Sequence, residues 1–211
     1  MRLLVATTNA GKAREFRRLL ADFEFEVDDL SAFSSLPVVE ETGHTFGANA
    51  CLKASYYAKG LESWTLADDS GLAVDALNGS PGVHSARWAQ MNQAGHGDAD
   101  NNSLLLRQLE LVSDERRTAR FVCVLALSDP AGRIVMTASD WVHGRILRAA
   151  RGEGGFGYDP LFFLDSHGKT TAELPPEEKN ALSHRGKALA RMRGLICRWR
   201  GAKVEGRDRN N

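Results

Sequence analysis

The chain has 211 residues, a length typical of one domain with a sizeable core. Its 27 Lys and Arg residues are balanced by 27 Asp and Glu residues, so the formal net charge is zero. A neutral chain is not drawn to nucleic acid or to an anionic membrane by its overall charge, and we expect neither as a partner. The three cysteines (Cys51, Cys123 and Cys197) are far apart, which is typical of the reduced thiols of a cytoplasmic protein. No apolar stretch approaches the roughly 20 residues of a transmembrane helix.

The chain opens with the pattern of a strand, a loop and a helix. Residues 3–7 form an apolar run typical of a buried strand, and residues 8–11 have the composition of a turn. From Lys12 onward, apolar residues recur at helical spacing, with charged residues on the other side. The apolar side carries Phe16, Leu19, Leu20 and Phe23, and the charged side carries Arg14, Glu15, Arg17 and Arg18. The elements expected next are a strand over 25–30, a loop over 31–45, a helix over 46–59 ending at Gly60, and strands over 65–67 and 72–74.

The second half mixes helical and strand patterns in the same way. The elements expected there are a long loop over 78–98, a helix over 101–111, strands over 119–127 and 134–142 joined by a hairpin turn, a glycine-rich loop over 152–157, and a last helix over about 185–200. The mixture predicts an α/β protein with a mixed sheet, in one domain over 1–200. We expect residues 201–211 to form a polar, flexible tail.

The loop after the first strand has the composition of an anion-binding site. Thr7, Thr8 and Asn9 offer neutral donors, Ala10 and Gly11 complete the turn ahead of the helix, and Lys12 offers a positive charge. Backbone N–H groups at a helix N-terminus bind phosphates. The glycine that a Walker A loop requires is absent, so this is a different cradle. An ordinary strand-to-helix turn with an Asn cap and an exposed Lys is the alternative.

Four carboxylates in two adjacent pairs are candidate metal ligands: Glu40, Glu41, Asp68 and Asp69. Mg²⁺ takes oxygen ligands and often needs only one or two protein carboxylates beside phosphates and water. Neighbouring residues of a strand point to opposite faces, so Asp68 and Asp69 enter one site only if the strand breaks, as Ser70 and Gly71 suggest. The alternatives are a solvated or helix-capping role for the glutamates and a simple turn at the aspartates.

The back half adds aromatic and basic candidates. The segment Phe156-Gly157-Tyr158-Asp159 combines a close backbone approach with rings that can stack on a base. Lys179, His184 and Arg185 stand at or before the last helix and can donate to a base carbonyl or a phosphate. Core packing is the alternative for the aromatics, and a structural role is the alternative for His184. Arg87 can equally be a phosphate contact, a partner-subunit contact or a surface charge.

Six blocks stand in a fixed order along the chain: Thr7-x-Asn9-x-x-Lys12, Glu40-Glu41-Thr42-Gly43, Ala67-Asp68-Asp69-Ser70-Gly71-Leu72, and the segments 81–87, 155–160 and 183–186. Together they resemble the Ham1/inosine triphosphate pyrophosphatase family, its bacterial branch in particular, over roughly residues 2–198. The resemblance implies an elongated mixed α/β fold with two lobes around a cleft, usually as a homodimer. It implies Mg²⁺-dependent hydrolysis of ITP, dITP and XTP to the monophosphate and pyrophosphate, which cleanses the nucleotide pool.

The resemblance also implies roles for individual residues. Asp69 is the expected general base and a Mg²⁺ ligand, and Glu40 is the expected second metal carboxylate, with Glu41 and Asp68 in reserve. The expected substrate contacts are Thr7, Thr8, Asn9, Ala10, Gly11, Lys12, Ser70, Phe156, Gly157, Tyr158, Asp159, Lys179, His184 and Arg185, with Lys53 a weaker candidate. Donors from His184 or Arg185 suit a 6-keto purine and leave adenine mismatched.

Three other functions fit parts of the pattern. A Maf-like pyrophosphatase would prefer pyrimidine or modified nucleotides over ITP. A nucleotide-binding module would bind without turnover, which the paired carboxylates argue against. An RNA-binding role for the C-terminal arginines is disfavoured by the zero net charge.

Overall fold

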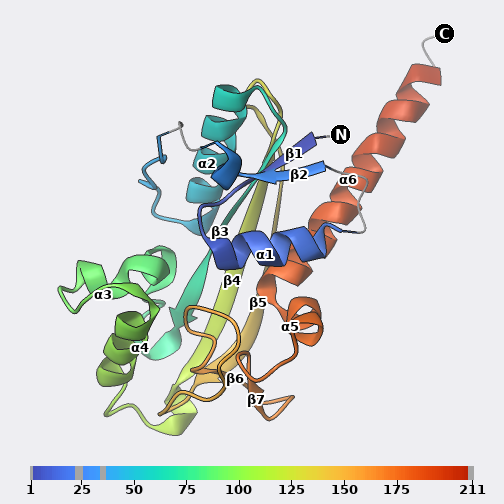
Figure 1. Ribbon diagram of the computed structural model, residues 1–211. Coiled ribbons are helices and arrows are strands. Elements are labelled where there is room, and N and C mark those ends of the chain that lie inside the picture. Colours follow the sequence, from blue (N-terminus) through green and yellow to red (C-terminus); the bar gives the residue numbers. More distant parts are fainter. Residues whose placement is uncertain (1, 22–25, 34–36, 209–211) are drawn as a thin grey trace.

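The computed structural model describes residues 2–21, 26–33 and 37–208, and it is built on a seven-stranded sheet in the order β2-β1-β3-β4-β5-β6-β7 (Figure 1). Strand β1 (Arg2–Ala6) pairs in parallel with β2 (Glu26–Asp29) and with β3 (Thr65–Val74). The remaining pairings are antiparallel, through β4 (Thr118–Ser128), β5 (Ile134–Ile146), β6 (Phe162–Leu164) and β7 (Lys169–Thr170). The sheet is therefore mixed, which confirms the predicted fold class.

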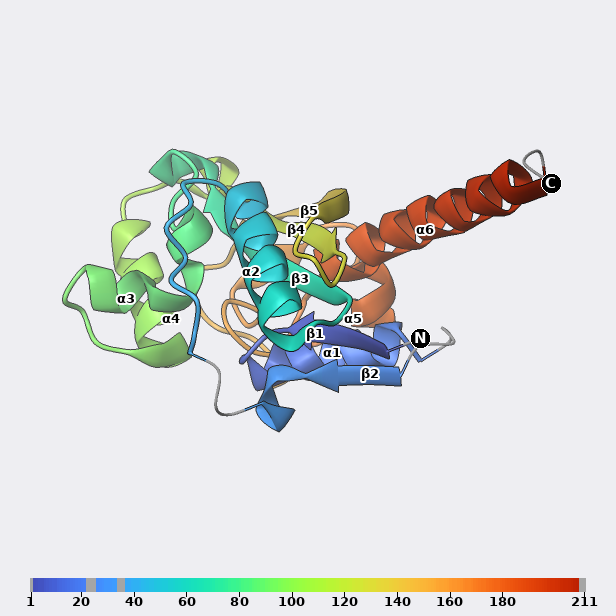
Figure 2. The same cartoon turned by 90° about the horizontal axis from the view of Figure 1, so that it is seen from above.

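The long β4–β5 hairpin joins two lobes (Figure 1). The first lobe carries β1, β2, α1 (Ala10–Leu19) and α2 (Phe46–Leu61). The second lobe carries β6, β7, α3 (Trp88–Met91) and α4 (Gly97–Gln108). Two further helices follow, α5 (Pro176–Leu182) and α6 (His184–Asp208), and Figure 2 shows α6 extending away from both lobes. No helix in the described ranges is long and apolar enough to cross a membrane.

Three apolar clusters hold these layers together. One lies between α1, α6 and one face of the sheet, where Phe16 and Met192 are fully buried. A second lies under α2, whose Ala50 and Ala54 allow the helix to approach the opposite face closely. The third fills the second lobe around Leu105. Because helices cover both faces of the sheet, β3 is buried along nearly its whole length.

Strand β3 is continuous, so the break expected at Ser70 and Gly71 is wrong. Antiparallel pairing with β4 runs without interruption from Thr65 to Val74 and includes both residues. The ladder of hydrogen bonds outweighs the weak strand preference of Ser and Gly. Gly71 is nevertheless required, because a Cβ there would lie 2.5 Å from the carbonyl oxygen of Gly82. Asp68 and Asp69 therefore point to opposite faces of the sheet.

Several boundaries differ from those expected. The segment expected to be one long loop contains the 3₁₀ helix η3 (Gly82–Arg87) and α3, because Asn101 bonds the backbone of residues 86 and 89 and gathers the chain there. Helix α6 continues to Asp208 instead of ending near Arg200, since no proline interrupts it. Phe23, expected on the apolar side of α1, lies outside the described residues.

Candidate active site

The loop before α1 has the capped geometry that the sequence predicts. The amide N of Lys12 donates to Asn9 Oδ1 at 3.0 Å, and the amide N of Asn9 donates to Thr7 Oγ1 at 3.2 Å. Asn9 is thus the N-cap of α1, so Ala10 and Gly11 form its first turn. The free N–H groups of this turn and the Lys12 ammonium stand at one end of a cavity between the lobes, a favourable place for an anion.

The polar lining of this inter-lobe cavity comes from five separate segments of the chain. Its polar lining comprises Thr7, Thr8, Asn9, Lys12, Glu41, Lys53, Asp68, Asp69, Ser70 and Arg87. A second hollow, the aromatic pocket, is lined by Phe121, Phe156, Gly157, Tyr158, Asp159, His184 and Arg185, and it shares Asn9, Lys12 and Ser70 with the first. The structure therefore brings most of the predicted phosphate and base contacts into two adjoining spaces, whereas Ala10, Gly11 and Lys179 line neither of them.

Asp69 faces α2. Its Oδ1 lies 3.0 Å from Lys53 Nζ, and its Oδ2 accepts a 3.3 Å hydrogen bond from Asn49 Nδ2. Lys53 and Asn49 stand one helical turn apart, so α2 presents both to the strand. Burial raises the pKa of Asp69 above its usual value, and the nearby Glu41 charge adds to this effect against the attraction of Lys53 and Lys12. A carboxylate with a raised pKa at the edge of a cavity is suited to accept a proton.

Glu41, not Glu40, stands beside Asp69. Glu41 Oε1 lies 2.5 Å from Lys53 Nζ, the same ammonium that binds Asp69, and its Oε2 accepts a 3.3 Å bond from Arg87. Burial opposes ionisation of Glu41, but Lys53, Arg87 and Lys12 together outweigh it and lower the pKa. Glu40 is exposed and lines an outer groove beside Tyr56 instead. The extended loop alternates direction from one residue to the next, so only one of the two glutamates can enter the cavity.

Asp68 has a different environment on the other face of β3. Its Oδ2 lies 2.7 Å from Lys12 Nζ and accepts a 3.1 Å bond from Ser70 Oγ, while its Oδ1 lies 3.1 Å from Cys123 Sγ. Despite burial, the Lys12 and Arg185 charges hold the pKa of Asp68 well below its usual range. A carboxylate held in this way stays charged and fixes the cations around it, so it is poorly suited to accept a proton.

The aromatic pocket is built around Phe156. Lys179 Nζ and the Arg185 guanidinium carbon lie 5.1 and 5.2 Å from its ring centroid. The ring also packs on α1, where a Cβ on Gly11 would lie 2.6 Å from the Phe156 ring. The carboxylate of Asp159 accepts 2.8 Å bonds from the amide N of Phe156 and from Lys179 Nζ. These contacts fix the ring beside two cations.

His184 is buried and neutral. Its ring stacks on Phe121 with centroids 5.0 Å apart, and burial lowers its pKa well below the usual value. His184 Nε2 and Arg185 Nε have no hydrogen-bond partner among the described residues. Buried polar atoms without hydrogen bonds are costly, and Arg185 Nε has only a 3.7 Å ionic contact with Asp68 Oδ2, so these two nitrogens beside one pocket indicate that a polar ligand completes the site. Tyr158, by contrast, donates to the carbonyl of Ser85 and belongs to the frame of the pocket.

Glu15 is a site residue that the sequence analysis placed on the solvent side of α1. The structure buries it, because its two oxygens accept 2.8 Å bonds from Lys179 Nζ and Arg185 Nη1. Those cations come from α5 and α6, more than a hundred residues away in sequence. The signal available was its position one helical turn after Gly11, on the side of α1 that meets the pocket.

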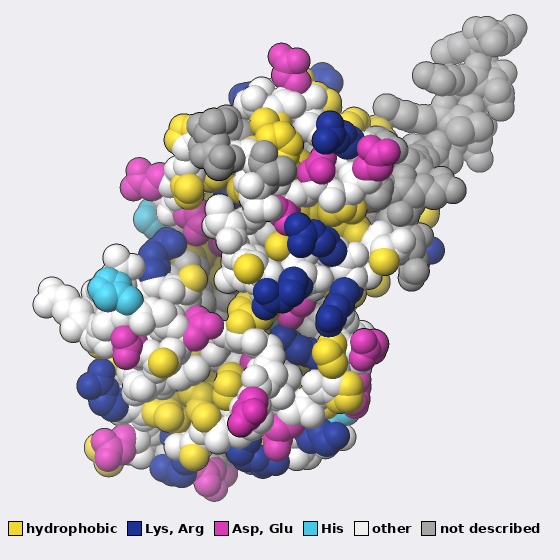
Figure 3. Space-filling view, in the orientation of Figure 1, with side chains coloured by type: hydrophobic (Ala, Val, Ile, Leu, Met, Phe, Trp, Pro, Cys, Tyr) yellow, Lys and Arg dark blue, Asp and Glu magenta, His cyan; other side chains and the backbone are white. Residues whose placement is uncertain are grey.

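Figure 3 shows basic side chains gathered over α1, in the middle of the face that both lobes share. Among the described residues no cluster of three or more His, Cys, Asp or Glu is arranged around one point. A cation at this site would therefore rest on the two carboxylates of Asp69 and Glu41 and on oxygens that a ligand brings.

Comparisons with known proteins agree with this geometry. The sequence profile of the Ham1 family matches residues 3–195. A dITP/XTP pyrophosphatase of Geobacillus kaustophilus is 52% identical over 190 residues, 90% of this chain and 91% of its own. One of Geobacter sulfurreducens is 50% identical, over 95% of this chain and 98% of its own.

Solved structures show the same relationship in three dimensions. A HAM1 protein from Coxiella burnetii superposes with a TM-score of 0.83 at 41% identity, covering 94% of this chain and 99% of its own. A nucleoside-triphosphatase (dITP/XTP pyrophosphatase) from Mycobacterium abscessus has a TM-score of 0.72 at 46% identity, covering 91% of this chain and 98% of its own. With the family profile matched over nearly its whole length and relatives this similar, the chain belongs to the Ham1 family.

Proposed function

We propose that this protein hydrolyses the non-canonical purine nucleotides ITP, dITP and XTP to the nucleoside monophosphate and pyrophosphate. The observation that carries the proposal is Asp69, a buried carboxylate with a raised pKa in the inter-lobe cavity, which also holds three cations and adjoins the aromatic pocket. Pyrophosphatases of this specificity are named among its relatives at about half identity.

The reaction needs a base beside the α-phosphorus. The oxygen of a water molecule bonds to that phosphorus, the bond to the bridging oxygen breaks, and pyrophosphate leaves with the electron pair. Asp69 accepts the proton of the water as this bond forms. Lys53 and Asn49 hold the carboxylate in place, and Lys12 with the first turn of α1 receives the growing negative charge.

The donors at this site suit Mg²⁺. Asp69 and Glu41 are hard oxygen ligands that already share one cation, the ammonium of Lys53. We propose that these two residues hold the metal, with Glu41 in the role that the sequence analysis gave to Glu40. Bound there, Mg²⁺ would neutralise charge on the phosphate oxygens.

The aromatic pocket accounts for the choice of base. Phe156 offers a face for stacking, and His184 and Arg185 offer unpartnered nitrogens. A 6-keto oxygen accepts from such donors, whereas the amino group of adenine leaves them unpaired. A mismatch of this kind discriminates by about 10⁴-fold. We also propose that the protein is a homodimer, as in the implied family pattern, which sedimentation analysis would test.

A product assay tests the function. The purified protein with Mg²⁺ is given ITP, XTP, GTP, ATP, dTTP and UTP, and pyrophosphate and phosphate are measured separately. We expect pyrophosphate from ITP and XTP, little product from the others, and no turnover with excess EDTA. A preference for dTTP or UTP would favour the Maf-like alternative, and binding of ITP without product would favour a regulatory module.

A further inference from the structure

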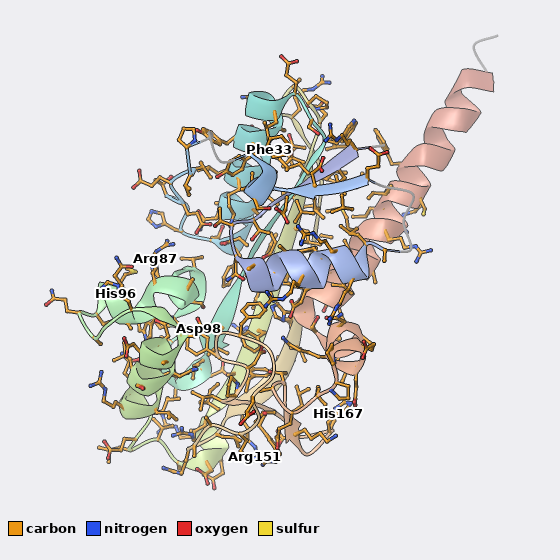
Figure 4. The ribbon with its side chains drawn as sticks, viewed as in Figure 1. Phe33, Arg87, His96, Asp98, Arg151 and His167 are labelled. Atoms are coloured by element: carbon orange, nitrogen blue, oxygen red, sulfur yellow. The ribbon has the colours of Figure 1, made fainter. Side chains whose placement is uncertain are left out.

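Arg87 is a third cation of the inter-lobe cavity, and it comes from the opposite side of that cavity. Lys12 and Lys53 belong to α1 and α2 of the first lobe, where each is paired with an aspartate of β3. Arg87 is the last residue of η3 and enters the cavity with the second lobe. Figure 4 shows it at the edge of that lobe, towards the loop that precedes α2.

The pairing of Arg87 is weak compared with that of the two lysines. Its Nη1 donates to Glu41 Oε2 at 3.3 Å, and its side chain remains 36% exposed. Within the described part of the chain this is its only hydrogen bond, although a guanidinium has five N–H donors. Glu41 meanwhile makes a shorter contact, at 2.5 Å, with Lys53. Most of the donor capacity of Arg87, which lines the cavity, is thus not used by the described residues.

The chemistry expected in the cavity uses both partners of this ion pair. A triphosphate brings several negative charges, and its oxygens match the fork of a guanidinium. The carboxylate of Glu41 is the group that we assign to the metal. Binding of substrate offers Arg87 a new anion, while Glu41 keeps the ammonium of Lys53 at 2.5 Å and can also take the metal, so Arg87 can exchange partners, with or without metal, without leaving a charge uncompensated.

We propose that Arg87 binds the triphosphate, exchanging Glu41 for phosphate oxygens of the substrate. This assignment rests on the proposed function and adds a substrate contact from the second lobe to those of Lys12 and Lys53. The two competing roles for the same ion pair are that Arg87 only positions Glu41 for the metal, and that it only ties the lobes together.

Binding without metal separates these roles. In EDTA, where no turnover occurs, inorganic tripolyphosphate probes the inter-lobe cavity and inosine probes the aromatic pocket, both by calorimetry. We expect Arg87→Gln to weaken tripolyphosphate binding by about 10- to 100-fold, the range for a charge-assisted bond, and to leave inosine binding unchanged. Arg87→Lys keeps the positive charge but loses the planar guanidinium, so its affinity for tripolyphosphate should lie between those of the wild type and Arg87→Gln. Arg120→Gln removes a similarly exposed arginine, paired with Asp75 outside this cavity, and should match the wild type.

The same substitution in a Glu41→Gln background gives the decisive comparison. If Arg87 binds phosphate, Arg87→Gln still weakens tripolyphosphate binding there, and kcat/KM for ITP falls in the otherwise wild-type enzyme mainly through KM. Unchanged tripolyphosphate binding, or a loss confined to the Mg²⁺ titration, overturns the proposal in favour of a positioning role. A lower melting temperature with normal binding overturns it in favour of a structural tie. If the wild type makes no pyrophosphate from ITP, the proposed function fails, whereas the tripolyphosphate result still reports on Arg87.

Discussion

Asp68 and Asp69 are adjacent in sequence, but their partners and the directions of their pKa shifts differ. Asp68 is held by Lys12, Ser70 and Cys123, and its pKa is well below the usual range. Asp69 is also buried, but its pKa is raised, because burial and the charge of Glu41 outweigh the cations. Only the second of these carboxylates combines access to the cavity with the ability to take up a proton.

We expect Asp69→Asn to fold normally and to lose at least about 10²-fold in kcat for ITP, the order associated with a general base. The amide keeps the shape of the side chain and its contact with Lys53 but cannot accept the proton. Steady-state kinetics with the pyrophosphate assay would measure the loss, and circular dichroism would verify the fold. Activity close to that of the wild type would remove Asp69 from the mechanism.

The pH dependence of kcat/KM should reflect the pKa of Asp69. A base whose pKa is raised loses its active form as the pH falls through that raised value, so the acid limb of kcat/KM should lie above 3.8, the ordinary pKa of an aspartate. An acid limb at or below the ordinary value would be inconsistent with this assignment.

The neighbouring glutamates form a matched pair for the metal proposal. We expect Glu41→Gln to raise the Mg²⁺ concentration needed for half-maximal activity by at least about tenfold, since a ligand carboxylate is lost. Glu40→Gln changes an exposed side chain one residue away and should behave as the wild type. Titration of activity with Mg²⁺ would compare the two. The opposite ranking would restore Glu40 to the role that the sequence analysis gave it.

At the scale of elements, a buried arginine fastens the second lobe. Arg117, just before β4, donates to the carbonyls of Leu109, Ile146 and Leu147 at 2.6 to 2.9 Å. It thereby ties the end of α4 to the end of β5. No carboxylate pairs with it among these hydrogen bonds, so its role is to satisfy backbone groups that strand and helix ends leave free.

We expect Arg117→Gln to lower the free energy of unfolding by about 2–5 kcal/mol, because several buried carbonyls lose their donors. Urea unfolding would measure the change. Arg116→Gln alters the exposed neighbour and should stay within about 0.5 kcal/mol of the wild type. Equal effects of the two substitutions would show that the three carbonyl bonds contribute little.

The helices and strands also show which features of the fold and site the sequence predicts. Periodicity predicts the first helix from Lys12 and the second from Phe46, within two residues of the observed starts of α1 and α2, because this signal is local. The break in β3 was predicted from Ser70 and Gly71, and it was wrong because pairing with β4, supplied from far along the chain, overrides local preference. The burial of Glu15 is not predicted for the same reason, since its partners lie on α5 and α6. The choice between Glu40 and Glu41 needs the path of a loop, which no pattern specifies.

At the scale of the whole molecule, charged side chains link segments that are distant in sequence. Glu15 joins α1 to α5 and α6, and burial of this carboxyl is outweighed by Arg185 and Lys179, so its pKa is lowered. A carboxyl with a lowered folded-state pKa contributes stability that is present above its unfolded pKa. That stability is lost as the pH falls through the folded value. The pKa of Asp68 is also lowered, so its contribution to stability is likewise lost as the pH falls.

We therefore expect the free energy of unfolding to fall as the pH is taken from 5 towards 3, below the ordinary pKa values of 4.5 for Glu15 and 3.8 for Asp68. Glu15→Gln should be less stable at pH 7 and should lose less on acidification. Glu110→Gln, at an exposed position, should follow the wild type. Urea unfolding at a series of pH values would test this. If the free energy of unfolding fell with pH in parallel for the wild type and Glu15→Gln, Glu15 would have no part in the acid sensitivity.

The uninterrupted ladder of β3 restricts how this chain can vary in length. Because consecutive strand residues alternate between faces, inserting or deleting one residue ahead of Asp68 would turn each of the two aspartates to the opposite face. After a deletion, Ser70 would stand opposite Lys53 in place of Asp69; after an insertion, an aspartate would still face α2, but none would stand in the place of Asp68 beside Lys12. Substitutions along β3 can be absorbed one at a time, whereas a single-codon insertion or deletion would remove a carboxylate from its place at once. Length changes should consequently be confined to the loops, and β3 should keep a constant number of residues among active descendants of this chain.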